Sequence, residues 1–232
     1  SGKFYQVPQE KFILTYPGVS FNYESATHFI LNFQHISDYR TFRIEAYYKE
    51  YDNLTRYVNN TADNSGYGHA KGIDFFYRDK KTISKADFWI SYSLLDTKRL
   101  YQDFPKEVMP SYAANNTASL VFKYFFPKIS LAPSLTYVYS SGRPYYNPAN
   151  PDYLGDRTND YHNLSINFSY LTSIKKNFTV VVFSVGNLLG IENVFTYNYS
   201  SDGSHRIAVG PTADRMFFAG VFINIGSQTD DS

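Results

Sequence analysis

Asp152, Asp156 and Asp160 recur every four residues in a polar stretch of the chain and are the first candidates for chemistry. Carboxylates in a loop can supply the oxygen ligands that a hard cation prefers. An interval of four does not reproduce the ligand spacing of an EF-hand, and Arg157 stands inside the cluster. We therefore expect solvated loop charges or an ion pair with Arg157, and no metal site.

Residues that could act in nucleophilic or acid–base catalysis are scattered along the chain. Cysteine is absent, which excludes a thiol nucleophile, a thiolate metal ligand and a disulfide framework. The sequence Ser184-Val185-Gly186 lacks the upstream glycine of a nucleophile elbow. The histidines form no cluster with these groups, so we expect a protein that is not an enzyme and uses no cofactor. They are His28, His35, His69, His162 and His205.

Tyrosine and arginine concentrate in two long polar stretches, residues 142–160 and 188–214. Aromatic and Arg side chains are the usual anchors of molecular recognition, so these stretches point to binding. Arg143-Pro144-Tyr145-Tyr146 could stack a nucleobase or a sugar, although a turn flanked by tyrosines explains the same residues. The candidate ligand-binding positions are Tyr145, Tyr146, Tyr153, Arg157, Tyr197, Tyr199, His205 and Arg206.

The composition predicts strands as the elements that carry these side chains. The 232 residues include 23 Tyr, 20 Phe and 1 Trp, which lose rotamer freedom in helices but pack well on a sheet. A formal net charge of +1 excludes the basic surface of a nucleic-acid binder. No apolar run approaches the roughly 18 residues of a membrane helix, whereas membrane-barrel strands need only about 9–11. No apolar signal segment follows Ser1, so we expect a mature chain or a fragment.

Nine segments favour strands because apolar side chains recur at every second residue or, in the last two, fill both parities. A tenth strand is present if Lys3–Val7 is the tail of a preceding one. No segment has a capped helical repeat, so the chain is predicted to be all-β. The segments are His28–Ile36, Thr41–Tyr51, Gly72–Arg78, Phe88–Leu94, Ser119–Phe126, Leu131–Ser140, Asn163–Tyr170, Phe178–Val185 and Met216–Ile225.

The connections alternate between short and long, which an up-and-down meander would sort to opposite ends. The long ones are predicted at Tyr57–Tyr67, Leu100–Tyr112, Gly142–Asp160 and Leu188–Asp214. The polar parity of the strands is mostly Asn, Ser, Thr and Gln, typical of a wet lumen, while the apolar parity ends in Tyr and Phe, as at a membrane interface. Charged lumen-facing candidates, expected to form an ion-pair ladder, are Arg43, Glu45, Lys49, Asp74, Arg78 and Lys123.

Several ordered motifs resemble the C-terminal barrel of TonB-dependent outer-membrane receptors of the Bacteroidetes type. They are TFRIEAYYKEYDNL, GYGHAKGIDFFYRDKKTI and DFWISYSLLDTKR between Thr41 and Arg99, then SLTYVYSSGRPYYNP, DYHNLSINFSYL, VGNLLGIENVF and the closing RMFFAGVFINIG. The resemblance extends from about Phe21 to Gly226. It implies antiparallel up-and-down transmembrane strands that form part of a barrel of roughly twenty-two strands. Residues 1–23 would be an extracellular loop region, 24–226 the barrel portion and 227–232 a polar tail.

The resemblance further implies uptake of a scarce nutrient, such as a siderophore, cobalamin, glycan or peptide, across the bacterial cell outer membrane. Partners would be the outer-membrane lipid, TonB through an upstream plug, a surface lipoprotein and a small-molecule or oligomeric nutrient ligand, but no nucleic acid. Two other hypotheses stay open: a stand-alone small outer-membrane barrel with a structural or adhesive role, and a soluble β-sandwich interaction domain.

Overall fold

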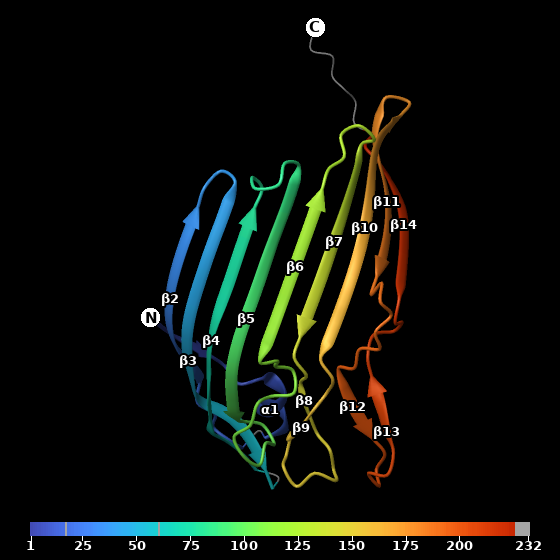
Figure 1. Cartoon of the computed structure of the whole chain (residues 1–232). Helices are drawn as coiled ribbons and strands as arrows, with labels where there is room; N and C mark the ends of the chain where they lie inside the picture. The colour runs from blue at the N-terminus through green and yellow to red at the C-terminus, as the bar shows by residue number, and fades with distance from the viewer. Residues whose placement is uncertain (17, 60, 226–232) are drawn as a thin grey trace.

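The computed structural model describes residues 1–16, 18–59 and 61–225, and it shows ten antiparallel strands in one curved sheet (Figure 1). Two small hairpins, β8–β9 and β12–β13, and one short helix, α1 (Glu10–Thr15), lie outside this sheet. The sheet strands are β1 (Gly2–Gln6), β2 (Glu24–Ile36), β3 (Arg40–Val58), β4 (Thr61–Asp79), β5 (Ala86–Leu100), β6 (Asn116–Tyr124), β7 (Leu131–Ser140), β10 (Tyr161–Ile174), β11 (Asn177–Gly186) and β14 (Met216–Ile223). The hairpin strands are β8 (Pro144–Tyr145), β9 (Asp156–Arg157), β12 (Thr196–Tyr199) and β13 (Arg206–Val209).

Every strand of the sheet pairs with its neighbour in chain order, apart from the hairpins inserted in two loops. The order is β1-β2-β3-β4-β5-β6-β7-β10-β11-β14, so the predicted all-β, up-and-down fold is confirmed. In the described part of the chain, β1 and β14 lie at opposite edges and do not pair with each other. These residues therefore form neither the closed small barrel nor the two-sheet sandwich of the alternative hypotheses.

One face of the sheet, called the outer face below, is apolar along whole rows of paired residues. Because side chains alternate along a strand and partners share a face, the register fixes which residues lie together. These side chains have no second layer over them, and Leu31 is 77% exposed. Two such rows are Tyr77, Ile90, Leu120, Tyr137 and Leu164, and Phe88, Phe122, Leu135, Ile166, Val185 and Phe217.

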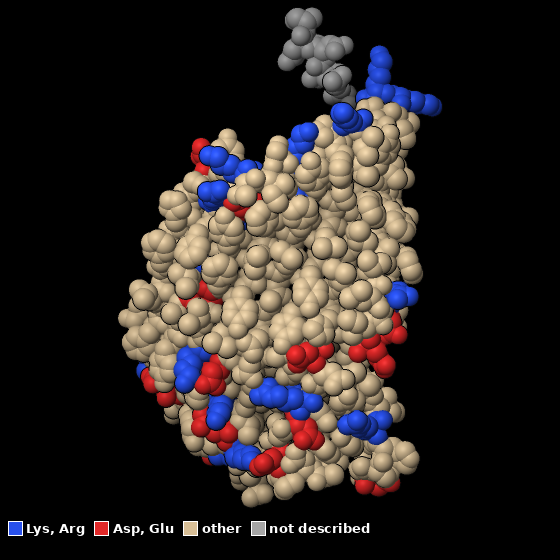
Figure 2. Space-filling view, viewed as in Figure 1, with Lys and Arg blue, Asp and Glu red and all other residues tan. Residues whose placement is uncertain are grey.

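Charged residues border this apolar surface at both ends of the strands. On β4 the outward positions between Lys71 and Asp79 are all apolar or aromatic, and eight residue steps correspond to about 26 Å along the strand. A membrane barrel carries an outward apolar band about 25 Å tall. Figure 2 shows this band as a broad uncharged middle between charged side chains at the two ends.

The opposite, inner face carries the polar parity predicted from the alternation. One row across it is Arg43, Phe76, Ser91, Ser119 and Val138, and the next is Asp74, Ser93, Thr117, Ser140 and Tyr161. Small hydroxyl side chains dominate β5, β6 and β7 here, which leaves open space above the sheet.

The sequence interpretation was wrong at the predicted long loop Tyr57–Tyr67. There β3 continues to Val58 and pairs with β4 from Thr61 onward, with register shifts between Tyr51 and Leu54 and between Leu54 and Arg56. Glycine, asparagine and these irregularities interrupt the apolar alternation, although backbone pairing persists. Gly66 is required in this hairpin because a Cβ would lie 2.5 Å from the Leu54 carbonyl oxygen.

Residues 1–23, predicted as a loop region, contain both β1 and α1. Gly2–Gln6 pairs with β2 over five residues, as the interpretation of Lys3–Val7 as the tail of a strand anticipated. The predicted tail, residues 227–232, lies outside the described residues. No helix in the described ranges is long and apolar enough to cross a membrane.

Candidate functional site

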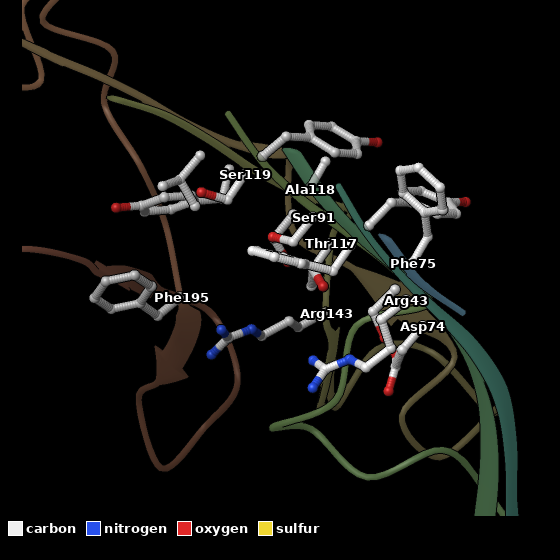
Figure 3. Close-up of a pocket in the computed structure, with 16 residues that line it drawn as sticks. Arg43, Asp74, Phe75, Ser91, Thr117, Ala118, Ser119, Arg143 and Phe195 are labelled. Atoms are coloured by element: carbon white, nitrogen blue, oxygen red, sulfur yellow. The ribbon is translucent and has the colours of Figure 1, made fainter. Parts of the chain in front are cut away.

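The loop-bearing end of the inner face holds a cavity of about 540 Å³ (Figure 3). Its floor is the two polar rows that cross β3 to β10, and its lining includes two residues from the loops, Arg143 and Phe195. Arg143 follows β7, and Phe195 comes from the segment between β11 and β12. The cavity therefore combines a rigid sheet floor with side chains from two loops that are distant in sequence.

Arg43 and Arg143 give the cavity its charge. Their guanidinium groups point to the same side of the sheet in Figure 3. Among the described residues, neither side chain forms an ion pair or a hydrogen bond, although Arg43 lies 5.9 Å from the centre of the Phe76 ring. Two guanidinium groups without carboxylate partners are available to an anionic ligand.

The nearest acidic residues on the inner face have partners of their own. Ser93 donates a hydrogen bond through its hydroxyl to Asp74, and Asn32 donates through its amide to Glu45 at 3.0 Å. Neither carboxylate is within 4 Å of an arginine nitrogen in the described chain. The cavity lining thus carries two guanidinium groups and one carboxylate, that of Asp74, which leaves an excess of one positive charge beside the Ser and Thr side chains of the floor.

The predicted lumen-facing residues all lie on the inner parity, but they do not form the predicted ion-pair ladder. Arg78 pairs with Asp87, while the ammonium groups of Lys49 and Lys123 each lie 5.0 Å from an aromatic ring centre, of Tyr47 and Trp89. The described strands offer few acidic side chains on this face, so aromatic rings take the place of carboxylates. The six residues are Arg43, Glu45, Lys49, Asp74, Arg78 and Lys123.

Most of the predicted ligand-binding loop residues meet in one aromatic cluster at the same end of the molecule. Its rings lie with centroids 4.8 Å apart for Tyr145 and Tyr197 and 5.9 Å apart for Tyr146 and Tyr153. A second cavity, of about 590 Å³, opens among these loops. Its lining includes Phe104, Tyr146, Tyr153, Tyr197, Tyr199 and Asp202.

The phenols in and beside this cluster are neutral at physiological pH, as any tyrosine is, and burial raises the pKa values of some of them further. It raises the pKa of Tyr101 to about 12, and it also raises the pKa values of Tyr145 and Tyr153 above the usual value for tyrosine. The cluster therefore presents neutral hydroxyl groups and ring faces at physiological pH. Such a surface suits contact with a ligand over a wide area.

Two predicted ligand positions lie apart from this cluster. Arg157 donates to the Gly142 carbonyl oxygen at 3.1 Å and contacts the Met109 sulfur at 3.4 Å, so it holds two loops together. His205 lies exposed at the tip of the β12–β13 hairpin, where its Nδ1 is 2.7 Å from the hydroxyl oxygen of Ser204.

The acidic cluster of the sequence is divided among separate partners. Lys106 binds Asp152 at 2.7 Å, asparagine amides bind Asp156, and Tyr139 donates to Asp160 at 2.9 Å. The predicted ion pair between Arg157 and one of these carboxylates is not formed, because the Arg157 guanidinium faces the Gly142 carbonyl. The described residues contain no group of three potential metal ligands.

The sequence interpretation missed Phe104, Arg143 and Phe195 as site residues. Arg143 stands in a quoted motif but was assigned to a turn, and only the fold of loop 141–160 brings it beside Arg43. Phe104 reaches the cluster because its ring lies 5.4 Å from that of Tyr153, across two loops. No spacing along the sequence indicates these contacts.

Comparison with protein-family models and with curated proteins finds no match. Solved structures do match. The ferric citrate transporter FecA, in its unliganded form, aligns with a TM-score of 0.70 and 12% identity over 96% of this chain and 35% of that chain. The siderophore receptor PiuA from Acinetobacter baumannii aligns with a TM-score of 0.65 and 17% identity over 88% of this chain and 29% of that chain. The ferric-catecholate import receptor Fiu from E. coli K12 aligns with a TM-score of 0.64 and 12% identity over 87% of this chain and 28% of that chain.

These matches define the class of fold. The chain has the antiparallel architecture of part of the barrel of TonB-dependent outer-membrane receptors, as predicted. It spans about a third of the length of the transport receptors that it matches.

Proposed function

We propose that this chain is the C-terminal barrel portion of a TonB-dependent receptor of the Bacteroidetes type in the bacterial cell outer membrane. Its role is uptake of a scarce nutrient, without enzymatic activity. TonB would supply the energy through a plug upstream of these strands, and a surface lipoprotein would help to capture the ligand. The inner face would contact water and ligand, and the outer face would contact lipid.

The pair Arg43 and Arg143 carries the proposal for the ligand site. Two guanidinium groups over one cavity, with no carboxylate within 4 Å in the described chain, favour a ligand with carboxylate or other oxyanion groups. Of the expected nutrient classes, this favours a negatively charged siderophore or peptide over a neutral glycan. The neutral phenols of the loop cluster would contact the same ligand on its way to the arginine pair.

Binding of ferric citrate, used as an anionic probe, tests this assignment on the full-length protein in detergent. Arg43→Gln and Arg143→Gln should each weaken binding about tenfold or more, because a charge-assisted hydrogen bond contributes about 1.5–3 kcal/mol. Isothermal titration calorimetry of each variant gives the dissociation constant.

Lys71→Gln is the matched control, because Lys71 lies on the outer parity and pairs with Asp96 at 3.2 Å. Loss of the Lys71 charge should leave the dissociation constant for ferric citrate unchanged. A neutral probe such as maltohexaose should be insensitive to all three substitutions. Equal affinity of the anionic probe for the wild type and for both arginine variants would refute the assignment of the cavity.

A further inference from the structure

The short turns at one end of the sheet carry lysine almost to the exclusion of acid. In the connections 37–39, 80–85, 125–130 and 175–176 there is one acidic residue, Asp38. We call the lysines of these turns the lysine rim. They are Lys80, Lys81, Lys85, Lys128, Lys175 and Lys176. The loops at the opposite end contain more acidic than basic residues, so the two ends of the molecule differ in charge, and Figure 2 shows blue side chains at the rim.

All six side chains of the lysine rim are in exposed residues, and none forms an ion pair within 4 Å among the described residues. The carboxylate of Asp87 acts on Lys80 of the lysine rim at longer range, but it is paired with Arg78. Lys85, Lys175 and Lys176 have φ values of 65°, 50° and 70°. Glycine or asparagine adopts this left-handed backbone at lower cost, so lysine here gives up conformational stability while placing charge at the turn.

An apolar groove of about 320 Å³ opens on the outer face next to the rim. Its cause is Pro133, which has no N–H to donate to the sheet. Pairing of β6 with β7 ends at Lys123 and Ser134, so the next pair, Tyr124 with Pro133, is not formed. Beyond it the two segments are joined only by the bridge between Phe126 and Leu131. The gap is lined by Phe122, Tyr124, Phe126, Pro133, Leu135 and Ile166.

Backbone hydrogen bonds fix the rim beside the groove. Phe125 donates to the Lys85 carbonyl oxygen at 3.0 Å, and Leu171 donates to that of Ser130 at 2.9 Å. Lys128 lies two residues after Phe126, which lines the groove. Charged and apolar parts of one amphipathic ligand could therefore be bound together.

We propose that the groove and the lysine rim form a binding site for a phospholipid with an anionic headgroup, from the leaflet that surrounds the short-turn end. One acyl chain fills the gap between Tyr124 and Pro133, and the phosphate and its anionic headgroup lie against Lys128 and Lys85. This inference rests on the proposed placement of the protein in a membrane. Charge complementarity selects the occupant, since a zwitterionic lipid would leave the rim uncompensated.

The test is native mass spectrometry of the full-length protein in mild detergent with an equimolar mixture of phosphatidylglycerol and phosphatidylethanolamine. Bound phosphatidylglycerol should predominate. Lys128→Gln should lower its retention about fivefold, because a lysine near an anionic lipid surface contributes about 1 kcal/mol, and should leave phosphatidylethanolamine unchanged. Lys106→Gln, at the opposite end, is the control for loss of charge.

A second pair of variants tests the groove. Ile166→Trp fills it with an apolar side chain and should reduce retention of both lipids, whereas Leu31→Trp on a distant part of the outer face should not. Equal retention of the two lipids by the wild type, or full retention by Ile166→Trp, would overturn the lipid site alone. A protein that stays monodisperse without detergent would instead overturn the proposed membrane function.

Discussion

The guanidinium carbon of Arg206 lies 4.5 Å from the centre of the Tyr197 ring, across the two strands of the β12–β13 hairpin. One nitrogen of the same guanidinium lies 3.4 Å from the hydroxyl oxygen of Tyr145, whose residue is 5% exposed. Arg206 thereby connects two hairpins from separate loops. Tyr145 and Tyr197 are also in ring contact, so the three side chains form one joint between loop 141–160 and loop 187–215.

Arg206→Gln should loosen this joint without unfolding the sheet. An exposed cation–π contact contributes about 0.5–1 kcal/mol, which corresponds to a two- to fivefold rise in hairpin opening. Limited proteolysis of the segment 196–209 should therefore become faster by about that factor. The control is Arg215→Gln, in the same loop but beyond the hairpin, and unchanged cleavage of Arg206→Gln would show that the contact holds nothing in place.

Order at the hairpin tip should depend on acidity through Asp202. Hydrogen bonds from Ser200 and Ser204 lower the pKa of this carboxyl to about 2. Because the pKa is lower in the ordered state than in the disordered one, near 3.9, the stabilisation is complete above about pH 4 and is lost as the pH falls through 2. Hydrogen exchange of residues 198–207 between pH 2 and 6 measures this. Asp202→Asn should remove this pH dependence of hydrogen exchange. The same pH dependence in the variant and the wild type would show that a group other than Asp202 is responsible.

Adjacent residues on β10 should respond in opposite ways to arginine. Ile166→Arg places a charge on the outer face, where it costs roughly 2–4 kcal/mol near the middle of a bilayer. Asn167→Arg lies on the inner face and should lose only the hydrogen bonds that Asn167 donates to the Ser184 hydroxyl, at 2.7 Å, and accepts from the Ser169 hydroxyl, at 3.0 Å. The folded fraction after insertion into vesicles, read from heat-dependent gel mobility, should fall for Ile166→Arg alone. Equal tolerance would mean that the two faces are wrongly assigned.

Asp79 should matter more for stability than its position at a turn suggests. Its side chain is 1% exposed and accepts hydrogen bonds from Arg40, Tyr77, Thr82 and the backbone N–H groups of Lys81 and Thr82. Asp79→Asn should lower the free energy of unfolding by about 2 kcal/mol, measured by urea titration in vesicles. Asp96→Asn, in an exposed pair with Lys71, should cost less than about 1 kcal/mol. Similar decreases in the free energy of unfolding in the two variants would show that the burial of Asp79 does not strengthen its hydrogen bonds.

Alternation in the sequence was sufficient to assign most strands and both faces. Phe75 and Phe76 have the same chemistry, yet the parity of their neighbours places the first outward and the second inward, as the register confirms. The method failed where β3 and β4 extend to Val58 and Thr61, because the pairing there is irregular around Asn53 and Gly66 and leaves no apolar period. Backbone hydrogen bonds do not require side-chain alternation.

The sequence by itself determined the all-β architecture, its two chemical faces and the placement of the short turns and of three of the four long loops, because each depends on neighbours within a strand or a turn. Only the tertiary structure decided the sites. Arg43 meets Arg143 and Tyr145 meets Tyr197 because the register of neighbouring strands and the packing of separate loops bring distant segments together. The groove at Pro133 likewise depends on the separation of β6 from β7 where the proline cannot donate a hydrogen bond. The sequence of one strand does not specify which strand lies beside it.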